Sequence, residues 1–134
     1  MILEHIAIWT GDIERLKEYY VRFFEAVPNA KYINTSKEFE SYFLSFKTGA
    51  RLEIMKMKGV PDNLNDTVHQ QHKGIIHLAF GVDTMTAVDA KAKELAAAGF
   101  PILNGPRKTG DGYYEFETLD PDLNRLEVTT LWRS

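Results

Sequence analysis

The sequence predicts an α+β protein built from two tandem βαβββ modules, and three observations support this fold class. The opening segment HIAIW has a counterpart HLAFG, in which His5 aligns with His77. The segment GARLEIM has a counterpart LNRLEVT, in which Glu53 aligns with Glu127. The two offsets, 72 and 74 residues, nearly agree, as expected of an internal repeat. In each copy a strand-like pattern is followed by apolar residues at helical spacing.

The composition is that of one ordinary globular domain. The 134 residues are 44% hydrophobic and 26% charged, with a net charge of −3. Acidic and basic residues are interspersed, so no basic stripe is available for nucleic acid. The sequence has no cysteine, which suits a reducing compartment. The charged start MILEHIAIW does not resemble a signal peptide, and no apolar run approaches the ~20 residues of a membrane span. We therefore expect a cytoplasmic protein that binds neither nucleic acid nor membrane.

The first module is expected at 1–56 of a single domain that covers 1–134. Its opening strand, 3–9, is rich in Ile, Leu and Ala. Asp12 can then cap a helix that has one apolar stripe and is expected to stop at Pro28. Three shorter strands complete the module, and the last of them contains the Arg-Leu-Glu triplet.

A polar connector, 57–74, leads to the second module, 75–134. Its opening strand is expected at 75–82, followed by a cap at Asp83-Thr84 and a helix that ends at Gly99. A turn signal in LDPDLNRLEV joins the last two strands. The three remaining strands are expected at 100–103, 113–119 and 124–131.

The alternation of side chains along a strand determines which residues share a face. In the opening strand, His5 and the large aliphatic residues alternate, so they point to opposite faces. His77 alternates with large apolar residues in the same way in the second module. Glu53 and Glu127 alternate with aliphatic residues in the same way. If the aliphatic residues pack under the helices, the two histidines and two glutamates occupy the uncovered face of the sheet.

Two interpretations of these four polar residues follow. Polar residues on an uncovered sheet face need no function, and Arg51 and Arg125 have the parity to pair with the glutamates. Alternatively, two imidazoles and two carboxylates in duplicate positions converge on one ion. Such a donor set suits a divalent first-row metal, which could be Zn, Ni, Co, Mn or Fe.

The sequence resembles the vicinal oxygen chelate superfamily, and within it the glyoxalase I-like (lactoylglutathione lyase-related) proteins. The motifs that carry the resemblance are HIAI, HLAF, FLSFKTGARLEIM and GDGYYEFETLDPDLNRLEV. The resemblance implies the glyoxalase/bleomycin resistance/dioxygenase fold, in which the modules form a curved mixed sheet. It also implies a divalent metal held by His5, Glu53, His77 and Glu127, and it suggests a homodimer, with the site in one chain or shared between two.

For a glyoxalase I-like protein the resemblance implies a lyase or isomerase that acts on a small α-ketoaldehyde–thiol adduct. A glutamate at the metal moves a proton through a metal-bound enediolate. We expect Glu127 to be this base, with Glu53 as the second candidate, because a closing lid in the second module would dry its surroundings. The alternatives are a metal-independent, ligand-sequestering protein of the bleomycin-resistance type, a dioxygenase, an epimerase or an antibiotic thiol transferase. The fourth expected ligand, Glu53, favours the glyoxalase branch, because the dioxygenases and thiol transferases usually use three.

The proposed lid is the glycine-rich segment 104–116, which is expected to be a loop. Arg107 or Lys108 could meet a substrate carboxylate there, although a solvated loop would have the same composition. Tyr113 and Tyr114 have opposite parity, so one of them could line the cup, while simple packing is the more common role.

Two aromatic residues of the first module are further candidates for substrate binding. Trp9 has the parity of His5, and Phe43 belongs to an aromatic strand that could wall a pocket or pack in the core. A departure from the family pattern lies in the last turn, where Leu123 replaces a glycine. We expect Asn124, which tolerates positive φ, to take over the turn conformation.

Overall fold

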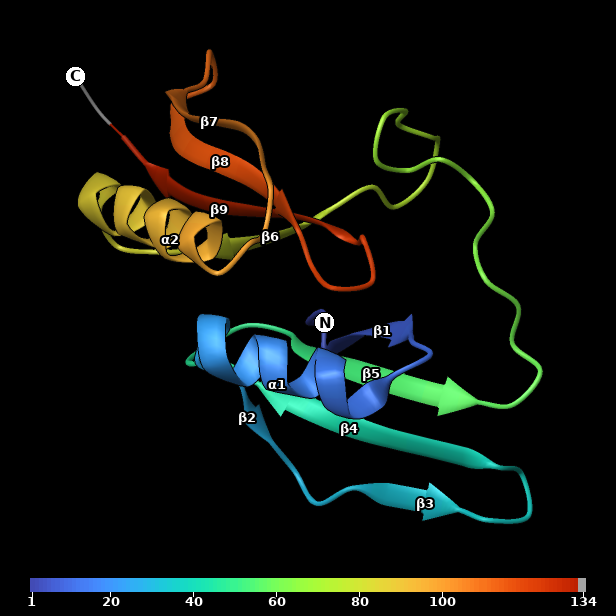
Figure 1. Ribbon diagram of the computed structural model, residues 1–134. Helices are drawn as coiled ribbons and strands as arrows, with labels where there is room; N and C mark the ends of the chain where they lie inside the picture. Colours follow the sequence, from blue (N-terminus) through green and yellow to red (C-terminus); the bar gives the residue numbers. More distant parts are fainter. Residues whose placement is uncertain (133–134) are drawn as a thin grey trace. The chain divides into compact units, whose positions relative to one another are not determined.

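The computed structural model, which describes residues 1–132, confirms the α+β class (Figure 1). The chain divides into two compact units, Met1–Leu64 and Asn65–Ser134, and each has a helix and a mixed sheet. The elements of the first unit are β1 (His5–Trp9), α1 (Ile13–Phe24), β2 (Val27–Pro28), β3 (Tyr32–Asn34), β4 (Phe39–Ser45) and β5 (Arg51–Met57). Those of the second are β6 (Leu78–Gly81), α2 (Met85–Ala97), β7 (Ile102–Lys108), β8 (Tyr113–Leu119) and β9 (Arg125–Leu131).

The first unit has a sheet with the strand order β1-β5-β4-β2, and β3 also pairs with β4. The first and last strands of the unit, β1 and β5, are parallel, and Ala7 pairs with Glu53. The pairing of β4 with β5 is antiparallel and places Phe43 beside Glu53. Leu52 and Ile54, of opposite parity, are buried, as the alternation of side chains predicts.

Helix α1 covers one face of this sheet. Its first turn is capped by Asp12, whose carboxylate accepts a hydrogen bond of 3.1 Å from the Arg15 amide. The helix ends earlier than Pro28, because Glu25 takes a left-handed conformation (φ 57°) and its N–H donates a hydrogen bond to the Tyr20 carbonyl. The buried side chains of the helix are Ile13, Leu16, Tyr19, Tyr20 and Phe23.

The second unit repeats this plan with the strand order β6-β9-β8-β7, in which β6 and β9 are parallel. Helix α2 is capped by Thr84, whose hydroxyl accepts a hydrogen bond of 3.1 Å from the Ala87 amide. Gly99, at φ 92°, follows the end of the helix as predicted. The core of this unit consists mainly of Val88, Ala92, Leu95, Phe116, Leu119, Leu126 and Val128.

The segment 104–116, expected to be a loop, is mostly strand. Strand β7 continues to Lys108, and β8 begins at Tyr113, so that only four residues connect them. The ladder accommodates Gly105 and Pro106 through two shifts of register, which lie between Ile102 and Arg107. The expected lid over the second module is therefore replaced by a hairpin with a short tip.

The last turn also differs from the expectation, because Leu123 itself adopts the positive φ (68°). Asp120 makes this possible, since its carboxylate accepts hydrogen bonds of 2.9 Å from the Asn124 amide and side chain. The Leu123 amide donates to the Asp120 carbonyl at 3.0 Å. This network holds the turn in a conformation that Leu disfavours on its own.

The boundary between the units lies between Leu64 and Asn65, within the expected connector. The connector's second part is fixed to its own sheet by Arg125, which donates hydrogen bonds of 3.1 Å to the Thr67 and Val68 carbonyls. The boundaries given above for the two modules stay a prediction. Within residues 1–132, no helix has both the length and the apolarity to span a membrane.

We predict that Gly105→Ala destabilises the protein, because Gly105 has φ +82° and an added Cβ would lie 2.5 Å from the Glu115 carbonyl oxygen. Loss of more than about 1 kcal/mol of unfolding free energy is expected in urea unfolding. Gly110→Ala is the matched control, since nothing lies within 4 Å of its added Cβ. Equal stabilities of the two variants would contradict the close approach of β7 to β8.

Candidate functional site

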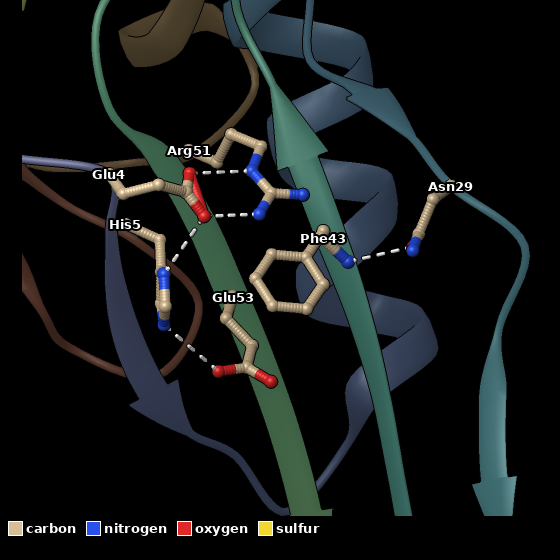
Figure 2. A network of polar contacts seen from close by, with 6 residues as sticks. All are labelled: Glu4, His5, Asn29, Phe43, Arg51 and Glu53. Atoms are coloured by element: carbon tan, nitrogen blue, oxygen red, sulfur yellow. Dashed lines mark hydrogen bonds and ion pairs between the residues drawn. The ribbon is translucent and has the colours of Figure 1, made fainter.

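The open face of the first unit brings together two of the predicted ligands, His5 and Glu53. Their side chains lie on the paired strands β1 and β5, and the distance between His5 Nε2 and Glu53 Oε1 is 3.7 Å (Figure 2). The aliphatic neighbours of Glu53 face the helix and are buried. The position predicted from parity is thus confirmed for this pair.

Arg51 pairs with a different carboxylate, Glu4, which precedes β1. Its Nε donates a hydrogen bond of 2.9 Å to Glu4 Oε2, and its Nη2 donates to Glu4 Oε1. Hydrogen bonding to Arg51 lowers the pKa of Glu4 to about 2. Glu4 Oε1 also lies 3.2 Å from His5 Nδ1. The arginine therefore directs its hydrogen bonds to Glu4, and the carboxylate of Glu53 faces the histidine.

Phe43 and Trp9 both lie on this open face. The Phe43 ring makes an edge-on contact with the His5 ring at a centroid distance of 5.3 Å, and Arg51 Cζ lies 4.2 Å from the Phe43 centroid. Trp9 makes an edge-on contact with Phe39 at 6.1 Å and is 42% exposed. Phe43 is therefore a neighbour of the His–Glu pair rather than a core residue.

The second unit contains the corresponding pair, His77 and Glu127. The distance between His77 Nε2 and Glu127 Oε2 is 3.4 Å, and the side chains are 35% and 13% exposed. Arg125 again pairs elsewhere, because its Nη1 donates a hydrogen bond of 3.2 Å to Glu117 Oε2. In both units the arginine of the repeated triplet therefore makes its side-chain hydrogen bonds with partners other than the triplet's glutamate.

Glu127 lies in an acidic environment that the sequence analysis missed. Glu117 pairs with Glu127 across β8 and β9, and Glu115 is the next residue of β8 on the same face. Burial raises the pKa of Glu127 to about 7, and the Glu115 charge, a Glu115 hydrogen bond and the Glu117 charge act in the same direction. Arg107 opposes this rise in the pKa of Glu127. Parity along YYEFET would have indicated both additional glutamates.

Two of the four candidate residues of the β7–β8 hairpin share this face. Arg107 pairs with Glu115, and Tyr113, 37% exposed, has the same parity in β8. The other two lie elsewhere: Tyr114 donates a hydrogen bond of 2.6 Å to Asp89 on α2, and Lys108 pairs with Tyr114. Lys108 Nζ lies 4.2 Å from the Trp132 ring centroid. Tyr114 is thus a packing residue, whereas Arg107 and Tyr113 remain candidates for substrate binding.

Within each His–Glu pair, the separation of the two facing atoms is of the size expected for two ligands of one ion. With metal–ligand bonds of about 2.0–2.2 Å, two ligand atoms of one ion lie roughly 3–3.5 Å apart, close to the separations within both pairs. Among residues 1–132, however, no three or more His, Asp or Glu side chains are grouped so that they could hold a metal ion. The convergence of all four residues on one ion therefore stays a prediction.

These features define a class of protein: two α+β units, each with a mixed sheet that carries a His–Glu pair on its open face. Residues 2–128 match the model of the glyoxalase/bleomycin resistance protein/dioxygenase superfamily, and the chain belongs to this superfamily.

Individual proteins resemble the chain at lower similarity. An uncharacterized Bacillus subtilis protein, YqjT, is 25% identical over 129 residues, which cover 94% of this chain and 96% of that protein. The structure of a glyoxylase/bleomycin resistance protein/dioxygenase domain from Frankia has a TM-score of 0.78 at 19% identity and covers 96% of this chain and 95% of its own. The trypanothione-dependent glyoxalase I of Leishmania major has a TM-score of 0.75 at 19% identity, with coverages of 98% and 86%. The structural likenesses support the fold.

We predict that Glu127 makes the stability of the metal-free protein depend on pH. Because its folded pKa of about 7 exceeds the ordinary 4.5, the folded state retains a proton that the unfolded state loses between these values. Stability should therefore fall as the pH rises through this window, and the loss should be complete above about pH 7.

Glu127→Gln cannot ionise and should lack this component. Urea unfolding of both proteins with a chelator, from about pH 5 to about pH 8, measures the difference in unfolding free energy. A difference that does not change with pH would contradict the raised pKa.

Proposed function

We propose that the protein is a metal-dependent lyase or isomerase that resembles glyoxalase I. Its substrate would be a small α-ketoaldehyde–thiol adduct or a related molecule with two neighbouring oxygens. The observation that carries the proposal is the duplicated His–Glu pair, at 3.7 Å in one unit and 3.4 Å in the other. Because each neighbouring arginine makes its hydrogen bonds elsewhere, both glutamates retain acceptor capacity for a cation.

We propose that one His5–Glu53 pair and one His77–Glu127 pair together hold the ion. Imidazole nitrogens and carboxylate oxygens suit Zn, Ni, Co, Mn and Fe, which this donor set distinguishes poorly. When bound, the ion would polarise the neighbouring substrate oxygens and stabilise the negative charge that develops on them.

Glu127 is proposed as the base that takes a proton from one substrate carbon and returns it to its neighbour. Its pKa of about 7 in the metal-free protein suits a proton carrier at neutral pH. The cause differs from the expected lid, since burial and the glutamates of β8 raise the pKa. Glu53 is the second candidate for this role.

The protein is further proposed to be a cytoplasmic homodimer. The outer strands of the two sheets offer edges for pairing with a second chain; they are β1, β2 and β3 in one unit and β6 and β7 in the other. A ligand-sequestering protein of the bleomycin-resistance type is the alternative that failure to bind a metal would favour.

We predict that His5→Ala and His77→Ala each lose bound metal without unfolding. Each replacement removes a ligand from an open face, so the melting temperature should fall only by the stabilisation that the ion provides. Metal content is measured by elemental analysis, and His69→Ala is the control because the His69 side chain is 83% exposed and contacts Asp66. Unchanged metal content in both variants would refute the ligand assignment.

Mixing the two variants determines whether the site belongs to one chain or two. If each site combines pairs from two chains, a mixed dimer of His5→Ala and His77→Ala regains one intact site. If both pairs come from the same chain, every chain carries a defect and mixing restores nothing. Elemental analysis after joint refolding of the two variants distinguishes these outcomes.

We predict that Glu127→Gln retains most of its metal but reacts at least ~100-fold more slowly with a thiol adduct of an α-ketoaldehyde. The amide keeps a ligand oxygen and the shape of the side chain but cannot carry the proton. Glu53→Gln is the matched variant in the first module. A large loss of rate in Glu53→Gln alone would reverse the two roles, and no loss in either would reject the lyase mechanism.

A further inference from the structure

Glu4, which no family motif discussed above includes, contacts both His5 and Arg51 through its carboxylate (Figure 2). Its carboxylate contacts Arg51 Nε, Arg51 Nη2 and His5 Nδ1. Its carbonyl accepts a hydrogen bond of 2.9 Å from the Arg51 amide. Both the backbone and the side chain of Glu4 are therefore attached to the strand that carries Glu53.

The network closes into a ring of four side chains. Arg51 stacks on Phe43 at 4.2 Å, and the Phe43 ring contacts the His5 ring at 5.3 Å. Phe43 is itself held through its amide, which donates a hydrogen bond of 2.8 Å to Asn29 (Figure 2). The His5 ring is thus restrained by a carboxylate at Nδ1 and by an aromatic edge contact.

The chemistry of the contact at Nδ1 selects one tautomer. An ionised carboxylate can only accept hydrogen bonds, so at 3.2 Å from Glu4 Oε1 the Nδ1 atom must carry the proton. A neutral imidazole with its proton on Nδ1 has its lone pair on Nε2. Nε2 is the atom that faces Glu53 at 3.7 Å.

The second module differs at the matching position. Ile76 precedes His77 where Glu4 precedes His5, and an isoleucine side chain accepts no hydrogen bond. In the described part of the chain, the polar contact of the His77 ring is that of Nε2 with Glu127. Among residues 1–132, a carboxylate beside the Nδ1 atom of the paired histidine is therefore found in the first module only.

We propose that Glu4 is a positioning residue that holds neutral His5 in the Nδ1-protonated form and directs its Nε2 lone pair toward the metal position beside Glu53. The benefit for metal binding rests on the proposed function, whereas the tautomer can be tested in the metal-free protein. Carboxylates that orient metal-binding histidines raise metal affinity by about 10–100-fold.

The first test is the tautomer of His5, observed through its ring ¹⁵N chemical shifts at about pH 8.5 in protein treated with a chelator. We expect Nδ1–H in the unmodified protein and loss of this preference in Glu4→Ala. Glu18→Ala, which removes a 69% exposed carboxylate on α1, should leave the signals unchanged. A dominant Nε2–H form in the unmodified protein, or no change in Glu4→Ala, overturns the proposal whether or not the protein binds a metal.

The second test separates positioning from a charge effect. Removing Glu4 also releases Arg51, which could then pair with Glu53 and compete with the metal. Zn²⁺ affinity, measured by competition with a chelator, should fall about 10–100-fold in Glu4→Ala and remain low in Glu4→Ala/Arg51→Ala. Recovery of affinity in the double variant would assign the effect to Arg51 and overturn the positioning role. No Zn²⁺ binding by the unmodified protein would instead contradict the proposed function and leave the tautomer test decisive.

Discussion

Parallel pairing between the first and last strands of each unit is the constraint on which the candidate site depends. This pairing places Ala7 beside Glu53 in one unit and Ala79 beside Glu127 in the other. A histidine two residues before each alanine has the same parity and lies on the same face. The small alanine leaves space beside the carboxylate, and the histidine can reach it from the neighbouring strand. A shift of register by one residue would turn the glutamate toward the helix.

The two units share this geometry but differ in the residues that surround the His–Glu pair. In the first, an arginine–glutamate pair and an aromatic ring restrain His5, so that orientation is the dominant feature. In the second, Glu127 is partly buried and has additional glutamates of β8 beside it, so that burial and then charge repulsion raise its pKa. On the proposed function, the first copy of the repeat would supply an oriented ligand and the second a proton-carrying group.

Most helices and strands could be predicted from the sequence, and so could the sheet face on which the His–Glu pairs lie. Both depend on periodicity along a single segment. The Asp12 and Thr84 caps follow from the local chemistry of side-chain oxygens in the same way. The strand β7 could not be predicted so readily, because Gly105 and Pro106 are typical of loops and only the pairing with β8 keeps them in a ladder. Leu123 at positive φ depends likewise on the Asp120 network, which no propensity describes.

The hydrogen-bond partners of Arg51 and Arg125 could not be predicted from the sequence for a further reason. Parity allowed Arg51 to pair with Glu53, and the choice of Glu4 depends on a residue just outside the strand. Arg125 similarly combines Glu117 with two carbonyls of the connector, 57 and 58 residues away in sequence. Long side chains can reach several acceptors, so the tertiary structure determines which acceptor each arginine uses.

Burial raises the pKa of Glu127, and the repulsion from neighbouring carboxylates that raises it further would favour a cation at this position. Burial and the nearby Glu115 and Glu117 charges raise the pKa of Glu127 to about 7, so that this carboxyl retains a proton near neutral pH. A divalent ion would relieve this repulsion more effectively than one proton, since it brings two positive charges to the same oxygens. Binding of an ion would therefore displace the proton, and the affinity would increase with pH through the range in which Glu127 ionises. On the proposed function, the acidic neighbours of the second unit would couple metal binding and proton release at Glu127, whereas the first unit would contribute a histidine whose orientation Glu4 sets.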